Sequence, residues 1–200
     1  MSGAETTLVV VTDQLLLFAS EGAEPTVDDL DGLMFGPGHV VRRADTARLS
    51  VLVDDVWRAE ALLAEFEARD LRGEFAPSRE DSGKLVVRTD FTERLTPLAA
   101  RRAAGGRARP AARLSGAALR LWVIAAGRAG DDAFLLPLPP TDQDRWQISG
   151  AALAARGLRA TMVGPRGGGP AYRITSHKRL AKLALLVGEP PSGAPPYCWP

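Results

Sequence analysis

Hydrophobic and polar residues follow two different periods along this 200-residue chain. Residues 47–53 alternate between apolar and polar side chains, which predicts a strand with one buried face. Residues 54–71 place apolar side chains three and four positions apart, which predicts a helix with one buried face. The same criteria predict the other elements of the first half: strands at 8–11, 39–43, 72–76 and 84–88, and helices at 27–35 and 91–102.

The second half repeats this order of elements. Its predicted helices and strands are helices at 114–126, 142–156 and 177–187 and strands at 133–138, 159–163 and 171–175. Residues 58–95 align with residues 148–180 in the order helix, strand, strand, helix. A period of about 80 residues is too long for a solenoid and fits a tandem duplication that folds with pseudo-twofold symmetry.

Helices are expected to begin at side chains that accept hydrogen bonds from the free N–H groups of the first turn. Residues of this kind precede four predicted helices: Thr26, either Thr89 or Asp90, Thr141 and Ser176. Gly157 follows the helix at 142–156, at the position where a left-handed glycine ends a helix.

Composition divides the chain into four segments. They are an acidic first repeat at 1–102, a basic Gly/Pro linker at 103–113, a basic second repeat at 114–188 and a proline-rich tail at 189–200. Because both repeats mix strands with helices, the predicted fold class is α/β, of the α+β type.

Charge is distributed unevenly, although the net charge of the chain is only +1. Residues 1–93 contain 9 Lys and Arg against 19 Asp and Glu, whereas residues 94–200 contain 16 against 5. A basic half of this density is expected of a nucleic-acid-binding protein. Attraction between the two halves would also account for the asymmetry, and so would an arginine-rich composition that reflects coding bias.

The sequence argues against membrane and disulfide-rich classes. No apolar run reaches the ~18 residues that cross a bilayer, and the N-terminal segment lacks the positive charge of an export signal. Cys198 is the only cysteine, which excludes an intramolecular disulfide and a cysteine-rich zinc site. We therefore expect a cytoplasmic protein without membrane contact. Trp199, in the tail, is expected to dock onto its own chain, and a partner is the alternative.

Two nine-residue segments, Leu30–Gly38 (LDGLMFGPG) and Leu119–Gly127 (LRLWVIAAG), resemble the motif of the LAGLIDADG family. Each has the leading leucine, the apolar centre and the closing glycine of that motif. The resemblance implies two repeats whose first helices pack about a pseudo-twofold axis, with mostly antiparallel, saddle-shaped sheets covered by helices. Small residues let such helices approach closely, and the expected interface residues are Gly32, Gly36, Ala125 and Ala126.

The sequence is more specifically similar to the degenerate repeats of the WhiA family of sporulation regulators. That family carries a first-repeat helix ending in a glycine pair, a basic Gly/Pro linker and a second helix ending in Ala-Gly, as this chain does. The similarity covers residues 26–188, so we expect the N-terminal part of that family without its helix-turn-helix domain. It implies a DNA-binding or transcription-associated function.

The resemblance to LAGLIDADG proteins also implies that this chain does not cut DNA. Nucleases of the family place an acidic residue at the eighth motif position of each repeat, where two carboxylates hold divalent metal. Pro37 and Ala126 occupy these positions here, and neither side chain binds a metal. We therefore expect no enzyme activity, no catalytic residue, no metal and no cofactor.

Basic residues of the linker and the second repeat are the candidate DNA contacts, through phosphates or guanine edges. They are Arg107, Arg109, Arg113, Arg159, Arg166, Arg173, Lys178, Arg179 and Lys182. A solvated basic face without a ligand is the alternative for these residues. The leading hypothesis is a catalytically inactive regulatory protein that binds double-stranded DNA. The alternative is a protein–protein interaction module that binds a regulatory protein and no nucleic acid.

Overall fold

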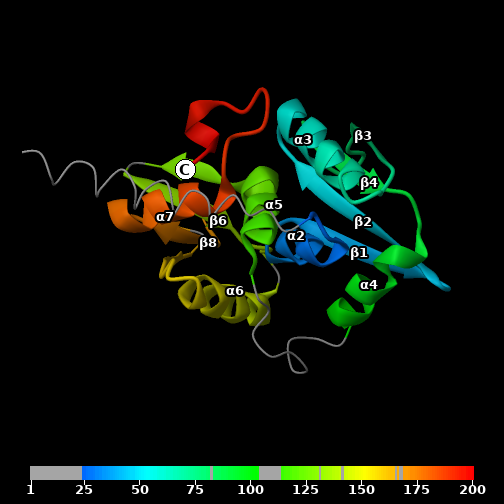
Figure 1. Ribbon diagram of the computed structural model, residues 1–200, viewed down its shortest axis with the longest axis horizontal. Helices are drawn as coiled ribbons and strands as arrows, with labels where there is room; N and C mark the ends of the chain where they lie inside the picture. Colours follow the sequence, from blue (N-terminus) through cyan, green and yellow to red (C-terminus); the bar gives the residue numbers. More distant parts are fainter. Residues whose placement is uncertain are drawn as a thin grey trace, which may run out of the picture.

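The computed structural model describes residues 24–81, 83–103, 114–130, 132–140, 142–164, 166 and 169–200. Within them the chain folds into two similar units that lie side by side (Figure 1). Each unit has a four-stranded antiparallel sheet and helices that cover it, which confirms the predicted α+β fold. The predicted strand at 8–11 and most of the predicted linker lie outside the described residues.

The first repeat opens with a 3₁₀ turn, η1 (Val27–Leu30), that continues into helix α2 (Asp31–Phe35). The elements that follow are β1 (Gly38–Arg43), β2 (Thr46–Val53), α3 (Val56–Glu67), β3 (Gly73–Pro77), β4 (Leu85–Thr89), the 3₁₀ turn η2 (Glu93–Leu95) and α4 (Thr96–Ala103). The strand order in this sheet is β1-β2-β4-β3.

The second repeat follows the same plan. Its elements are α5 (Gly116–Ala126), β5 (Arg128–Gly130), β6 (Ala133–Pro137), α6 (Gln143–Ala155), β7 (Thr161–Val163), β8 (Ala171–Ile174) and α7 (His177–Val187), followed by a short 3₁₀ turn, η5 (Pro196–Cys198). The strand order β5-β6-β8-β7 matches that of the first sheet, strand for strand. Among the described residues, no helix has the length and apolar character that a bilayer crossing requires.

The caps of the first repeat follow the prediction at one helix and depart from it at another. Thr26 takes part in a reciprocal capping box at the start of η1. At η2 the cap is Thr92, rather than the predicted Thr89 or Asp90. Thr89 is unavailable because its hydroxyl is buried in the sheet, where it accepts a hydrogen bond from the Leu49 N–H at 3.0 Å.

Other element boundaries also shift. Asp142 caps α6, one residue beyond the predicted Thr141, which lies outside the described residues. Helix α3 ends at Glu67 rather than near residue 71, because Asp70 adopts a left-handed φ of 53°. Gly157 has the predicted left-handed conformation, with a φ of 72°. Strand β5 was not predicted, since its three exposed residues show no alternation.

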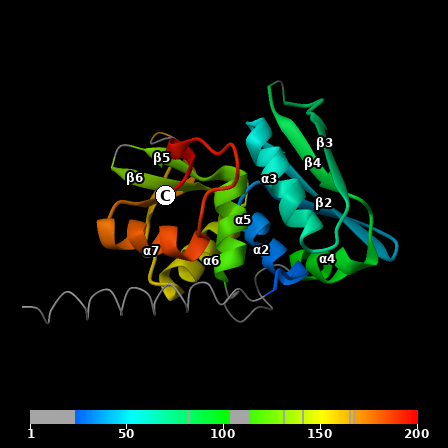
Figure 2. The same ribbon diagram turned by 45° about the horizontal axis from the view of Figure 1, so that its top comes forward.

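Helices α2 and α5 lie against each other between the two sheets (Figure 2). A Cβ atom on Gly32 would lie 1.8 Å from the backbone oxygen of Ala118, so only glycine permits this approach. A Cβ atom on Gly36 would lie 2.8 Å from the ring of Trp122, which stacks on Phe35 with ring centroids 5.5 Å apart. The two motif helices therefore pair, and both predicted glycines lie at their interface.

On the α5 side, the residues nearest to the two glycines are not the predicted alanines. Ala118 and Trp122, rather than Ala125 and Ala126, lie opposite the two glycines. Ala125 packs into the core of the first repeat, in one cluster with Leu33 and Met34 of α2, and Ala126 is half-buried at the last residue of α5.

The C-terminal tail docks onto the chain itself, as predicted. Trp199 packs against buried residues of both repeats, and its indole N–H donates to the Gly188 carbonyl at 2.8 Å. The Arg120 guanidinium lies 5.3 Å from the centroid of the Trp199 ring. Arg120 also forms an ion pair of 2.9 Å with Glu65 of α3, so the tail covers a point where the two repeats meet.

Replacing Gly32 with alanine should lower the free energy of unfolding by more than about 2 kcal/mol, because the added methyl group forces α2 and α5 apart. Gly164→Ala is the matched control, since no atom of the described residues lies within 4 Å of a Cβ atom placed there, and it should change stability by less than about 0.5 kcal/mol. Urea denaturation measures both. Equal stability of the two variants would contradict the close helix contact.

Candidate nucleic-acid interface

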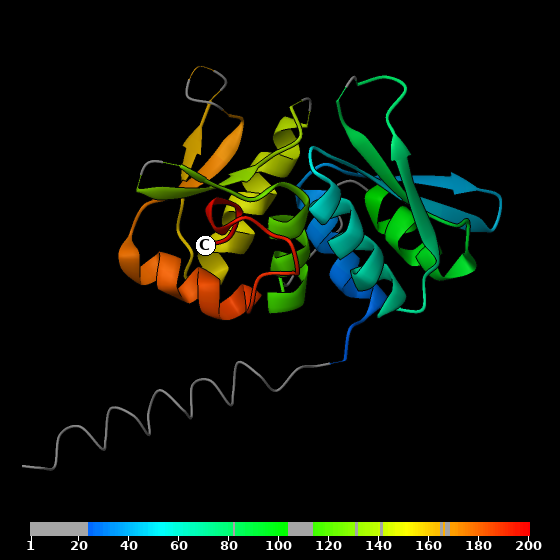
Figure 3. The same ribbon diagram turned by 90° about the horizontal axis from the view of Figure 1, so that it is seen from above.

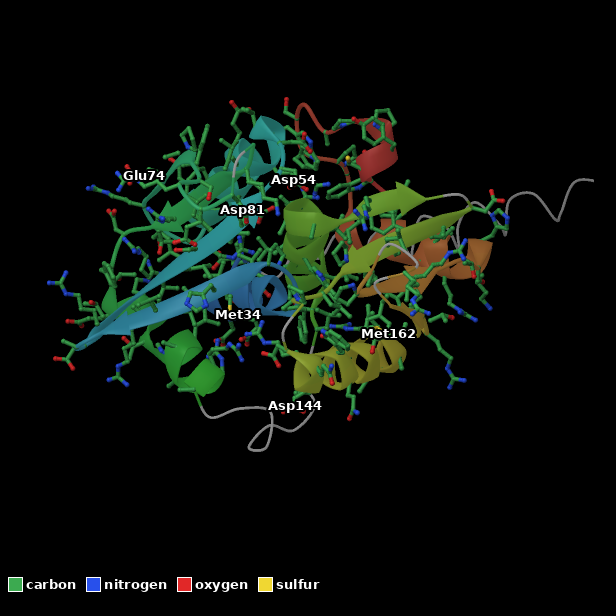
Figure 4. The ribbon with its side chains drawn as sticks, turned by 180° about the vertical axis from the view of Figure 1, so that it is seen from behind. Met34, Asp54, Glu74, Asp81, Asp144 and Met162 are labelled. Atoms are coloured by element: carbon green, nitrogen blue, oxygen red, sulfur yellow. The ribbon has the colours of Figure 1, made fainter. Side chains whose placement is uncertain are left out.

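Strand alternation gives each sheet one face packed against helices and one face that points away from them. The buried residues of β2 are Ala47, Leu49, Val51 and Val53. In β8, Tyr172 and Ile174 are buried beneath α6 and α7, so Arg173 between them points outward. We call the side away from the helices the outer face of each sheet. The β3–β4 and β7–β8 hairpins extend toward this side (Figure 3), and Figure 4 views the molecule from it.

Cross-strand register aligns one row of outward side chains across each sheet. The rows are His39, Ser50, Arg88 and Glu74 in the first sheet and Arg128, Leu135, Arg173 and Thr161 in the second. Because the strand order is the same, Arg88 and Arg173 occupy equivalent places, as His39 and Arg128 do. The duplication therefore repeats basic side chains at matching positions on the two outer faces.

A groove with a volume of about 420 Å³ lies on the outer face of the first sheet. Its charged and titratable lining residues are His39, Arg48, Arg79, Glu80, Asp81 and Arg88. Pro37, at the eighth position of the first motif, lines the same groove. The groove therefore joins the end of α2 to the outward row of the sheet.

Arg48 is held in place within this groove. Its guanidinium lies 4.7 Å from the centroid of the Phe91 ring, so the cation stacks on an aromatic face. Its Nε atom is buried and has no hydrogen-bond partner among the described residues. A guanidinium fixed on one side by a ring keeps its other N–H groups available for a phosphate or a base edge.

The structure separates the predicted DNA contacts into different places. Arg173 lies on the outer face and Arg166 in the β7–β8 loop. Arg159 precedes β7 instead of lying within it, and its carbonyl accepts a hydrogen bond from Arg179 at 2.5 Å. Three predicted contacts lie on α7, which covers the opposite face of the sheet: Lys178, Arg179 and Lys182. The predicted linker contacts lie outside the described residues: Arg107, Arg109 and Arg113.

Sequence reasoning missed the basic residues on the outer face of the first repeat. Arg48 and Arg88 occupy the polar phase of strands that were predicted, so their direction was available from alternation alone. Both arginines were missed because the net charge was counted over the whole acidic half of the sequence. A count restricted to the outward positions of the predicted strands would have identified Arg48 and Arg88.

The eighth position of each motif lies at the end of its helix, with Pro37 just after α2 and Ala126 as the last residue of α5. Pro37 and Ala126 supply no oxygen ligand from their side chains. Within the described parts of the chain, no group of three or more His, Cys, Asp or Glu side chains is arranged to hold a metal ion. The side chains at these two positions therefore do not supply the carboxylates that the resemblance predicts for a metal site.

Arginine side chains occupy the helix ends instead, and each crosses from the opposite repeat. Arg58 of α3 donates to the carbonyls of Val123, Ile124 and Gly127 at the end of α5, at 3.2, 2.6 and 2.6 Å. Cations are favoured there because the last carbonyls of a helix carry partial negative charge. The Arg58 side chain is 6% exposed and lies 3.5 Å from the Asp55 carboxylate.

The second repeat supplies the matching contact. Arg145 of α6 donates to the Met34 carbonyl near the end of α2 at 2.5 Å, and it pairs with Asp142 at 2.9 Å. Burial and the nearby Arg102 lower the pKa of Arg145 to about 10, and Asp142 opposes both effects. Arg145 therefore stays charged at neutral pH. The spacing Asp-x-x-Arg recurs at the start of α3 and α6, so the duplication preserved both caps.

Comparison with known proteins identifies the fold. The sequence matches no family model and no curated protein. The homing endonuclease I-WcaI, bound to its DNA recognition sequence, is similar with a TM-score of 0.60 and 12% identity over 92% of this chain and 88% of that one. Full-length DUF199/WhiA from Thermatoga maritima has a TM-score of 0.61 and 12% identity over 90% of this chain and 61% of its own. The N-terminal LAGLIDADG domain of DUF199/WhiA has a TM-score of 0.57 and 10% identity, over 88% of this chain and 91% of that domain.

These similarities confirm a LAGLIDADG-like fold for this chain. The chain spans less than two thirds of full-length DUF199/WhiA but nearly all of its N-terminal LAGLIDADG domain. At 10 to 12% identity, the shared property is the arrangement of helices and strands, and function has to be argued from side chains.

Replacing Arg58 with methionine should lower the free energy of unfolding by about 3 kcal/mol, because three carbonyls at the end of α5 lose a charged donor. Arg72→Met is the control, since Arg72 is exposed, and its effect should stay below about 0.5 kcal/mol. Urea denaturation monitored by tryptophan fluorescence compares the two variants. A loss no greater than that of the control would mean that the cap contributes nothing to stability.

Proposed function

We propose that this chain binds duplex DNA across the outer faces of its two repeats and does not cut it. The observation that carries this proposal is the recurrence of basic side chains at equivalent outward positions. Arg88 and Arg173 lie at equivalent places in the two sheets, each in one cross-strand row with a further basic residue, His39 in the first sheet and Arg128 in the second. A twofold-repeated set of cations suits a duplex, whose two phosphate backbones are themselves related by a twofold axis.

The fold supports the same assignment. One similar structure is a homing endonuclease bound to its DNA recognition sequence, and it aligns over 92% of this chain. Arginine side chains on the outer faces supply donors for phosphates and for guanine edges. Arg48 adds a stacked guanidinium within the groove of the first sheet.

Absence of nuclease chemistry is the second part of the proposal. Pro37 and Ala126 stand where the resemblance expects metal-binding carboxylates. The guanidinium of Arg58 donates to the carbonyls of Ile124 and Gly127, close to Ala126 in the chain. A divalent cation at this place would be repelled by the positive charge of Arg58. The site therefore favours binding without cleavage.

A transcription-associated role is the finer proposal, and it draws on the similarity to DUF199/WhiA. The protein–protein interaction module remains the competing proposal. Selection from a random pool of duplexes separates these two proposals. A gene regulator should retain particular duplex sequences, whereas a protein–protein interaction module should retain no duplex.

Replacing Arg88 and Arg173 together with alanine should weaken binding to a random duplex by about tenfold or more, because both cations lie on the outer faces. The control is Lys178→Ala with Lys182→Ala, which removes the same charge from α7. Fluorescence anisotropy at low salt measures both. A larger loss in the α7 variant would place the duplex on the helical side.

Incubation of supercoiled plasmid with the protein and Mg²⁺ or Mn²⁺ should leave the plasmid uncut, because the helix ends lack metal-binding carboxylates. Agarose electrophoresis measures the result, and a reaction with a chelator is the control. Nicking that requires the metal and disappears with the chelator would contradict the proposal.

A further inference from the structure

The β3–β4 loop places two carboxylates at the edge of the basic groove. Glu80 and Asp81 line the groove together with Arg48 and Arg88, and Asp81 is seen on this side in Figure 4. A groove that only held phosphates would gain nothing from these acidic side chains, because like charges repel across it. Their presence therefore points to a role other than phosphate binding.

Backbone hydrogen bonds order the loop that carries the two carboxylates. The Ser78 hydroxyl accepts hydrogen bonds from the N–H groups of Glu80 at 3.3 Å and of Asp81 at 3.1 Å. The Lys84 N–H donates to the Asp81 carbonyl at 3.2 Å, and the Lys84 ammonium lies 3.9 Å from the Asp81 carboxylate. The ordered loop thus holds both acidic residues beside the groove that they line.

The second repeat has no counterpart to this acidic pair. In the sequence, the loop that joins β7 to β8 contains Arg166 and no carboxylate. The outward rows show the same difference in acidic residues: the first sheet has Glu74 where the second has the uncharged Thr161. The outer face of the first repeat thus mixes acids with arginines, whereas the equivalent row of the second carries no acid.

Carboxylates and arginines have opposite preferences on a duplex. Arginine binds phosphates regardless of sequence, whereas a carboxylate is repelled by phosphate and accepts hydrogen bonds from base amino groups, such as cytosine N4. A groove with both kinds of side chain binds weakly to a backbone alone. It gains affinity only where base edges satisfy the carboxylates.

We propose that Glu80 and Asp81 are specificity-determining residues, which suppress sequence-independent binding by the first repeat and reserve its groove for duplexes with suitably placed base amino groups. This inference rests on the proposed function. It assigns different tasks to the two repeats: the second supplies affinity for the backbone, and the first discriminates among sequences.

The test compares the full-length chain with the double variant Glu80→Gln and Asp81→Asn, which keeps side-chain shape and removes two charges. The matched control is Glu60→Gln with Glu67→Gln, which changes the net charge equally on the exposed surface of α3. The probe is a fluorescein-labelled duplex of randomised sequence, titrated by anisotropy at low salt. The groove variant should bind about fivefold more tightly than the wild type, and the control should stay within about twofold.

A second readout is selection from a random duplex pool. The wild-type chain should enrich a sequence preference, and the groove variant should lose part of it. If the wild type binds and the groove variant binds no more tightly than the control, the specificity role is wrong while the proposed DNA binding stands. If neither the wild type nor either variant binds any duplex, both the specificity role and the DNA binding are wrong.

Discussion

Contact between the Gly32 backbone and helix α5 determines where both sheets lie. The two helices touch without an intervening side chain, so each repeat completes part of the other's core. Phe35 packs among the buried residues of the second repeat, while Leu121 and Ala125 pack among those of the first. Because the shared helices lie at the centre, the two sheets turn their outer faces to the same side of the molecule (Figure 3).

The two arginine caps act on the same pair of helices, α2 and α5. Arg58 and Arg145 each cross from one repeat to the motif helix of the other, and each is accompanied by an aspartate three residues earlier. Burying a guanidinium is costly unless its donors are satisfied, and the helix-end carbonyls satisfy them. The ends of the two motif helices thus contribute to the packing of the two repeats.

Local sequence patterns predicted the helices and strands. They did not predict contacts between segments that are distant in the sequence. Alternation in β2 and the capping box at Thr26 depend on neighbouring residues, so the sequence alone was sufficient. The bond from Arg58 to Ile124 joins residues 66 positions apart, and no local pattern signals it. The arginines on the outer face of the first repeat were missed for a different reason. Most acidic residues of this repeat lie elsewhere, so a charge count over the whole repeat hid Arg48 and Arg88.

Photocrosslinking to a duplex tests most directly whether DNA lies across both outer faces. A photoreactive residue placed at Ser50 or at Leu135 occupies an equivalent outward position in either sheet, whereas one placed at Leu185 lies exposed on α7. Binding across the outer faces predicts crosslinks from Ser50 and from Leu135 to the same duplex and none from Leu185. Crosslinks from Leu185 alone would contradict it.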